Sequence, residues 1–244
     1  MNLPNPVKHI PNTITLANLF MGCLSIVSAF EGNLVLAAYL IIIAAIFDFL
    51  DGFSARLLKA YSPLGKELDS LSDLVSFGVA PSIIVYHLLK DALGTSASGG
   101  FTGGQVLLTI PFLIAVFSAL RLAKFNIDTR QTTSFIGLPT PANALFIVGI
   151  VIGLNSSYSE WFQYVTKSPA TIVVMALVVS ALLVSPIPMF SLKIKGFVLK
   201  KIWKQLLLIV LTVIAIVLLG LASLSIVILL YVLISLVTMP FEKQ

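Results

Sequence analysis

Four aspartates stand at the ends of two strongly apolar segments, in a chain that carries little other charge. Asp48 and Asp51 fall near the end of the apolar run 34–57, and Asp69 and Asp73 near the start of the run 67–89. A charged side chain in or beside a membrane span is costly and is usually functional. On a helix that advances about 100° per residue, the members of each pair share a helix face. The spacing therefore predicts four carboxylates that face a common cleft.

Crowded carboxylates repel one another unless cations neutralise them. Two Mg²⁺ or Mn²⁺ ions would balance four negative charges, and such hard metals prefer oxygen ligands. The neighbouring residues suit a phosphate-bearing ligand. Gly52 and Ala55 remove side-chain bulk where a ligand would approach the backbone, and Arg56 presents a planar fork to phosphate oxygens. The segment thus predicts a two-metal site for a phosphorylated substrate.

Two other interpretations of the aspartates stay open. They could form an interfacial ion-pair network with Arg56, Lys59 and Lys66, although buried ion pairs are costly to form. They could also serve as a cation or proton relay in a transporter. A relay would not require Gly52 and Ala55 at fixed offsets from the aspartates.

The composition indicates a polytopic membrane protein. Of the 244 residues, 58% are hydrophobic and only 10% are charged, whereas a soluble domain carries roughly a quarter charged residues. The net charge of +5 comes from Lys and Arg clusters between apolar runs, as expected for membrane topology rather than nucleic-acid binding. A single cysteine, Cys23, excludes an intrachain disulfide.

The apolar runs predict an all-α bundle of about eight transmembrane helices: a six-helix core and two C-terminal spans. The last run, 205–240, is too long for one span at about 1.5 Å per residue, so a turn is expected near Gly220. We predict a catalytic core over 1–190 and an added unit over 191–244, which holds a basic loop and the final two spans. The predicted spans are 13–30, 34–57, 67–89, 105–123, 142–154, 169–187 and two within 205–240.

The basic residues predict the orientation. With the N-terminus in the cytoplasm, all Lys and Arg residues except Lys90 and Lys167 fall on the cytoplasmic side, in agreement with the positive-inside rule. The aspartates then lie at the cytoplasmic face of the membrane. We expect a multi-pass protein of the inner (cytoplasmic) membrane.

The aspartate segment resembles the signature of the CDP-alcohol phosphatidyltransferases. The pattern D-x2-D-G-x2-A-R-x8-G-x3-D-x3-D is met in full over positions 48–73. The resemblance implies a membrane enzyme that moves a phosphatidyl group from CDP-diacylglycerol to an alcohol and releases CMP. It also implies a homodimer.

The resemblance further implies a role for each residue. Asp48 and Asp69 would bridge two divalent metals, with Asp51 and Asp73 completing the two sites. Asp73 would also act as the general base on the attacking hydroxyl. The CDP-lipid would contact positions in the signature and near the first span: Asn12, Asn18, Gly52, Ala55, Arg56, Ser62 and Gly65.

Two later blocks bear on the acceptor alcohol. Residues 118–126 and 135–143 resemble blocks of the bacterial membrane-bound phosphatidylserine synthases, which more often have Arg in place of Lys124. Arg121 and Asn126 suit an amino-acid acceptor, because a guanidinium can hold a carboxylate at two points. L-serine is therefore the predicted acceptor. An acceptor that carries phosphate, such as glycerol 3-phosphate or inositol phosphate, is the alternative, and Arg121 could instead be a basic anchor at a span end.

Overall fold

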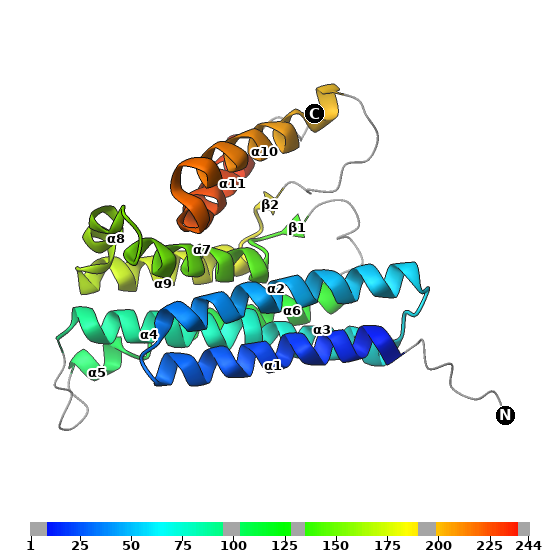
Figure 1. Ribbon diagram of the computed structural model, residues 1–244, viewed down its shortest axis with the longest axis horizontal. Helices are drawn as coiled ribbons and strands as arrows, with labels where there is room; N and C mark the ends of the chain where they lie inside the picture. Colours follow the sequence, from blue (N-terminus) through cyan, green and yellow to red (C-terminus); the bar gives the residue numbers. More distant parts are fainter. Residues whose placement is uncertain (1–8, 95–102, 128–134, 190–198, 239–244) are drawn as a thin grey trace.

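Nearly the whole described chain is helical. The computed structural model describes residues 9–94, 103–127, 135–189 and 199–238, and Figure 1 shows them as long helices lying side by side. The predicted all-α class is confirmed, with one short antiparallel pair of strands, β1 (Phe135–Ile136) and β2 (Pro188–Met189). The helices are α1 (Ile10–Phe30), α2 (Leu34–Leu57), α3 (Pro63–Asp73), η2 (Leu74–Val79), α4 (Ala80–Ala92), α5 (Gly103–Leu107), α6 (Phe112–Ile127), α7 (Thr140–Leu154), α8 (Ser159–Thr166), α9 (Pro169–Val184), α10 (Leu199–Leu219), η3 (Gly220–Ala222) and α11 (Ser223–Thr238).

Several helices are long and apolar enough to cross a membrane, as expected of a multi-pass membrane protein. Among the described residues, five segments meet this criterion, or six if α7 and α8, which meet at 119°, count as one broken span. The predicted count of eight is therefore not confirmed. The run 205–237 counts as one segment by length, yet α10 and α11 pack against each other on either side of Gly220, where φ is +59°. A turn near Gly220 was predicted.

The start of the third predicted span differs from the sequence prediction. The third span was predicted to begin at residue 67, but the helix already begins at Pro63. Ser62 caps it, since its side chain accepts a hydrogen bond from Gly65 N at 3.0 Å. Proline suits the first helical position because it has no N–H to satisfy there and its φ is already helical. The third helical segment is therefore longer at its N-terminal end than predicted.

Other helix boundaries also differ from those predicted from the sequence. The fourth predicted span is interrupted between α5 and α6, where residues 108–111, Pro111 among them, form a turn. The connection after α7 contains a helix, α8, that the sequence did not indicate. Most of the Gly- and Ser-rich loop at 91–104 and the start of the basic loop at 191–198 lie outside the described residues.

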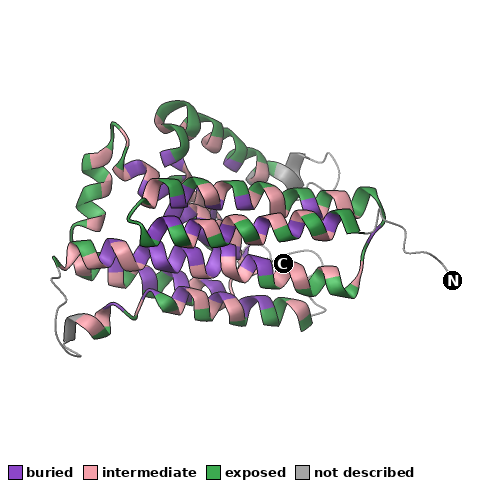
Figure 2. Cartoon of the chain, turned by 60° about the horizontal axis from the view of Figure 1, so that its bottom comes forward, coloured by how far each residue is buried: buried purple, intermediate pink, exposed green. Residues whose placement is uncertain are grey.

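Small residues allow the first two helices to pack closely. Ala29 on α1 and Ala37 and Ala38 on α2 are fully buried, and Ser25 Oγ donates to Ala37 O at 2.8 Å. Such residues are typical of close helix contacts in membranes, where lipid supplies little hydrophobic driving force. In Figure 2 the buried residues gather along the inner helices and the exposed ones along the outside. The core places the N-terminal half of α1 beside α3.

Candidate functional site

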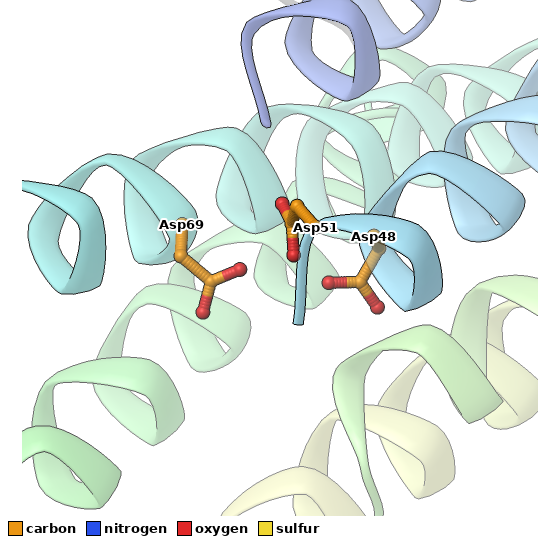
Figure 3. A group of neighbouring side chains, drawn as sticks. All are labelled: Asp48, Asp51 and Asp69. Atoms are coloured by element: carbon orange, nitrogen blue, oxygen red, sulfur yellow. The ribbon is translucent and has the colours of Figure 1, made fainter. Parts of the chain in front are cut away.

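Three of the four predicted carboxylates form one group. Asp48 and Asp51 project from the C-terminal part of α2, and Asp69 projects toward them from α3 (Figure 3). Their ligand oxygens all lie within 4.8 Å of one another. Because a five-residue loop joins α2 to α3, the two acidic helix ends lie at the same end of the bundle. The group offers the hard oxygen ligands that a divalent cation prefers, so these residues could hold a metal ion.

Asp73 is buried, with 8% of its surface exposed, and so is Asp51 in the group of three, at 6%. The Asp73 carboxyl group interacts electrostatically with those of Asp48, Asp69 and Asp51. Asn18 Nδ2, from α1, donates to Asp73 Oδ1 at 3.5 Å. The structure therefore places the fourth predicted carboxylate next to the group of three, and it places Asn18 against Asp73.

Helix α1 holds the acidic helices in place, a role that the sequence analysis missed. Thr15 Oγ1 donates to Asp51 Oδ2 at 2.6 Å. Ser72 Oγ donates to Thr15 O and Ser76 Oγ to Asn18 O, both at 3.0 Å. These bonds fix α3 and η2 along α1. The repeat of polar residues at 12, 15 and 18, on one helix face, is the sequence signal that could have identified Thr15.

A π-helical segment, η2, follows Asp73 directly. It turns Ser76 toward α1, where Ser76 lies against Gly22, and Gly78 toward Ser118 of α6. π-Helical turns inside α-helices are frequent at functional sites. The sequence carried no signal for this segment, yet it decides which side chains beyond Asp73 face each neighbouring helix.

A cleft of about 400 Å³ opens beside the carboxylate group. Its walls come from α1, α2, α3 and the loop between α2 and α3. Among the lining residues are Asp48, Asp51 and Asp69, together with six of the seven residues predicted to contact a CDP-lipid: Asn12, Gly52, Ala55, Arg56, Ser62 and Gly65.

The two glycines in this cleft differ in their surroundings. A Cβ at Gly65 would lie 2.9 Å from Asn12 Oδ1 and 3.1 Å from Ser62 Oγ, so a side chain there would require the Asn12 side chain to move. A Cβ at Gly52 would meet only Arg56 Nη1, at 3.8 Å, which is an ordinary contact. Protein packing therefore does not explain Gly52, and the space beside it belongs to the cleft.

The structure separates the two residues predicted to bind the acceptor. Arg121 is buried, and its Nη1 donates to Thr140 Oγ1 of α7 at 3.0 Å. Asn126 Nδ2 instead donates to Ser70 Oγ of α3 at 2.9 Å. The two residues therefore face different neighbours, because five helical positions rotate a side chain by about 140°.

Comparison with known proteins identifies the family. The sequence model for CDP-alcohol phosphatidyltransferase matches residues 8–182, which include the whole cleft and the carboxylate group. The chain belongs to the CDP-alcohol phosphatidyltransferase family. Helices α10 and α11 lie beyond the matched part.

The names of several similar proteins refer to serine phosphatidyltransferases or to an archaetidylserine synthase. A Helicobacter pylori (strain J99) CDP-diacylglycerol–serine O-phosphatidyltransferase is 39% identical over 156 residues, which are 63% of this chain and 61% of that protein. The Bacillus subtilis enzyme of the same name is 36% identical over 149 residues, 58% of this chain and 75% of its own. An archaetidylserine synthase from Methanothermobacter thermautotrophicus is 37% identical over 153 residues, 62% of this chain and 60% of its own. The chain thus spans about three fifths of the length of the Helicobacter relative.

Proposed function

We propose that this CDP-alcohol phosphatidyltransferase transfers the phosphatidyl group of CDP-diacylglycerol to the hydroxyl of L-serine, with phosphatidylserine and CMP as products. The observation that carries the reaction type is the group formed by Asp48, Asp51 and Asp69 on the wall of a cleft that also presents Arg56. The names of the relatives support serine as the acceptor.

In this proposal the carboxylates hold two Mg²⁺ or Mn²⁺ ions. Asp48, Asp51, Asp69 and Asp73 would hold the ions. The ligand oxygens of Asp48, Asp51 and Asp69 lie within 4.8 Å of one another, which supports this assignment for these three residues. The hydrogen bond from Thr15 orients Asp51 in the way that outer partners orient metal ligands. When bound, the ions supply charge stabilisation for the diphosphate and the departing CMP.

The remaining cleft residues bind the CDP-lipid. Arg56 pairs with phosphate oxygens, which its planar guanidinium fits at two points. Gly52 and Ala55 leave room for the nucleotide, and Ser62, Gly65 and Asn12 also line the cleft. Asn18 Nδ2 donates a hydrogen bond to Asp73 Oδ1 and so orients the Asp73 carboxyl group. Positioning of the two substrates supplies much of the rate enhancement.

The chemical step needs one proton acceptor. The serine hydroxyl oxygen forms a bond to the lipid-linked phosphorus, and the bond from that phosphorus to the bridging oxygen of CMP breaks. CMP leaves with the bonding electron pair, and the hydroxyl proton passes to Asp73. The position of Asp73 next to carboxylates that line the cleft supports this assignment, because a general base must be able to reach the hydroxyl that attacks there.

Arg121 and Asn126 are proposed to bind the acceptor, with the carboxylate of serine on Arg121.

The test of the proposed function is CMP release from CDP-diacylglycerol in detergent micelles with Mn²⁺ and one acceptor at a time. We expect release with L-serine, and none above background with glycerol 3-phosphate or inositol phosphate. Serine-independent release, or a preference for a phosphorylated acceptor, would refute the serine assignment. Cation flux into vesicles without CMP release would instead indicate a transporter.

Gly52→Ala is expected to separate stability from activity. The new methyl group fits the protein, at 3.8 Å from Arg56 Nη1, and alanine is favoured over glycine in a helix by about 1 kcal/mol. Thermal stability should therefore stay equal or rise. The methyl group would enter the space proposed for the CDP-lipid, so kcat/KM for CDP-diacylglycerol should fall about tenfold or more.

The measurement for Gly52→Ala pairs a melting curve with initial rates at varied CDP-diacylglycerol. Gly32→Ala is a poor comparison because Gly32 has φ of +80°. Ala55→Gly, on the same helix, is the better comparison variant, since it removes side-chain bulk from the cleft whereas Gly52→Ala adds it. Unchanged kcat/KM in Gly52→Ala would contradict the proposed contact.

The remaining proposals concern the assembly and the membrane. We place the protein in the inner (cytoplasmic) membrane as a homodimer, with the N-terminus and the carboxylate group on the cytoplasmic side. Residues 1–190 form the catalytic core in this proposal, and 191–244 an addition to it. The end of the family match at residue 182 supports the division.

A further inference from the structure

A second polar cluster lies between α6 and α7, outside the cleft. Arg121 of α6 and Thr140 of α7 are joined by the hydrogen bond of 3.0 Å. Ser118 precedes Arg121 by three residues, and Asn143 follows Thr140 by three, so each lies one helical turn along on the same face. All four are less than a tenth exposed. A polar cluster is therefore enclosed in an otherwise apolar part of the bundle.

Several polar atoms of this cluster lack a hydrogen-bond partner within the described part of the chain. They are Ser118 Oγ, Arg121 Nε and both side-chain atoms of Asn143, Oδ1 and Nδ2. Buried polar groups are almost always hydrogen-bonded, and an unsatisfied one destabilises the protein. The fully buried Asn143 amide, which has no partner among the described residues, is accounted for if a polar ligand supplies its hydrogen bonds.

The cluster lies next to the proposed base. Arg121 interacts electrostatically with Asp73. Gly78, in the π-helical segment after Asp73, packs so closely on Ser118 that a Cβ there would be 3.0 Å from Ser118 Cβ. A small ligand held by Arg121 would therefore be near the carboxylate that takes the proton.

Helix α11 closes the cluster from a third side. Tyr231 of α11 is 5% exposed and packs in the same buried group as Leu138, two residues before Thr140. Tyr231 also interacts electrostatically with Arg121. With water kept out on this side, charged contacts inside the cluster are stronger than they would be in solution.

The charge of the cluster suits a carboxylate better than a phosphate. Among the Lys and Arg side chains whose burial the structure describes, Arg121 is the only buried one. One guanidinium balances the single charge of a carboxylate, whereas a phosphate monoester carries close to two charges at neutral pH. Asn143 is neutral, and its Oδ1 can accept a hydrogen bond from an ammonium group.

We propose that Asn143 is a further acceptor-binding residue, which together with Arg121 selects a small zwitterionic hydroxy amino acid. Arg121 binds the carboxylate, Asn143 Oδ1 accepts from the ammonium group, and the hydroxyl faces Asp73. This inference rests on the proposed function and deepens it, since it assigns the second charge of the acceptor to a residue. Thr140 holds Arg121 in position.

The test measures the KM for L-serine and inhibition by two competitors in Asn143→Ala. Ethanolamine lacks the carboxylate, and 3-hydroxypropionate lacks the ammonium group. We expect the KM for serine and the inhibition constant of ethanolamine each to rise about tenfold or more, as for loss of a hydrogen bond to a charged group. The inhibition constant of 3-hydroxypropionate and the KM for CDP-diacylglycerol should stay within about twofold.

Asn155→Ala provides the matched control. Asn155 lies just past the opposite end of α7, where its Nδ2 donates to Val151 O, so the same change there should leave all four constants unaltered. If Asn143→Ala does not fold, Asn143→Ser keeps a hydroxyl acceptor and should show a smaller rise for serine and ethanolamine.

The outcomes distinguish the inference from the function on which it rests. No serine-dependent CMP release by the unsubstituted protein would refute both. Serine-dependent release with an unchanged serine KM in the variant, or with equal changes for both competitors, would refute the role of Asn143 alone. A parallel rise in the KM for CDP-diacylglycerol would also refute it, since that pattern indicates general damage to the bundle.

Discussion

Asp73→Asn is expected to lower the rate of serine-dependent CMP release by about 100- to 10,000-fold, the usual contribution of a general base. The amide keeps the size of the side chain and can still bond to Asn18, but it cannot take up the hydroxyl proton. Because Asp73 lies outside the cleft lining, binding of CDP-diacylglycerol should persist. A stopped-time assay of CMP and an equilibrium binding measurement with the CDP-lipid would check both parts.

Asp91→Asn is the control for this change. Asp91 lies near the other end of the same continuous helical segment and is exposed, so its substitution should leave the rate unchanged. Full activity in Asp73→Asn would remove the proposed base. Loss of CDP-diacylglycerol binding together with activity would show that metal or lipid binding by Asp73, and not proton transfer, accounts for the lost rate.

Removal of divalent metal is expected to reduce CMP release to background. Three carboxylates with oxygens within 4.8 Å of one another repel when no cation lies between them, and the diphosphate would add further negative charge. Treatment with a chelator should therefore abolish activity, and Mn²⁺ or Mg²⁺ should restore it. A titration of each metal against the initial rate is the measurement.

Asp69→Asn connects this metal dependence to the proposed ligands. Loss of a residue that only orients a ligand typically weakens metal binding about 10- to 100-fold, so loss of a ligand should raise the half-activating Mn²⁺ concentration by at least that factor. Glu67→Gln, two residues away and exposed, should leave the titration unchanged. An unaltered titration in Asp69→Asn would show that Asp69 does not bind the activating metal.

The local features of this site were predictable from the sequence. The apolar runs indicate helices, and the spacing of the aspartates puts each pair on one helix face because helical rotation per residue is nearly constant. The short connection between α2 and α3 brings the two acidic ends to the same end of the bundle. Asp48, Asp51 and Asp69 were therefore expected to meet, and they do. Family membership, indicated by the same spacing, is confirmed.

Features that depend on contacts between distant segments were not predictable in the same way. The helix start at Pro63, before the predicted start at residue 67, is stabilised by the capping bond of Ser62. The helix α8 and the strand pair β1–β2 form where tertiary packing brings short segments together. The number of membrane spans also remains a prediction, because segment length alone does not separate α10 from α11.

Sequence alone determined the helical membrane class of this protein and the line of carboxylates along two neighbouring helix ends, since both follow from hydrophobicity and helical rotation. Tertiary structure decided what surrounds those carboxylates. It brought Thr15 and Asn18 of α1 to Asp51 and Asp73, directed Arg121 and Asn126 to different neighbours, and left the Asn143 amide buried without a partner among the described residues. The physical reason is that side-chain direction on one helix is local, whereas the groups it meets are set by how the helices pack.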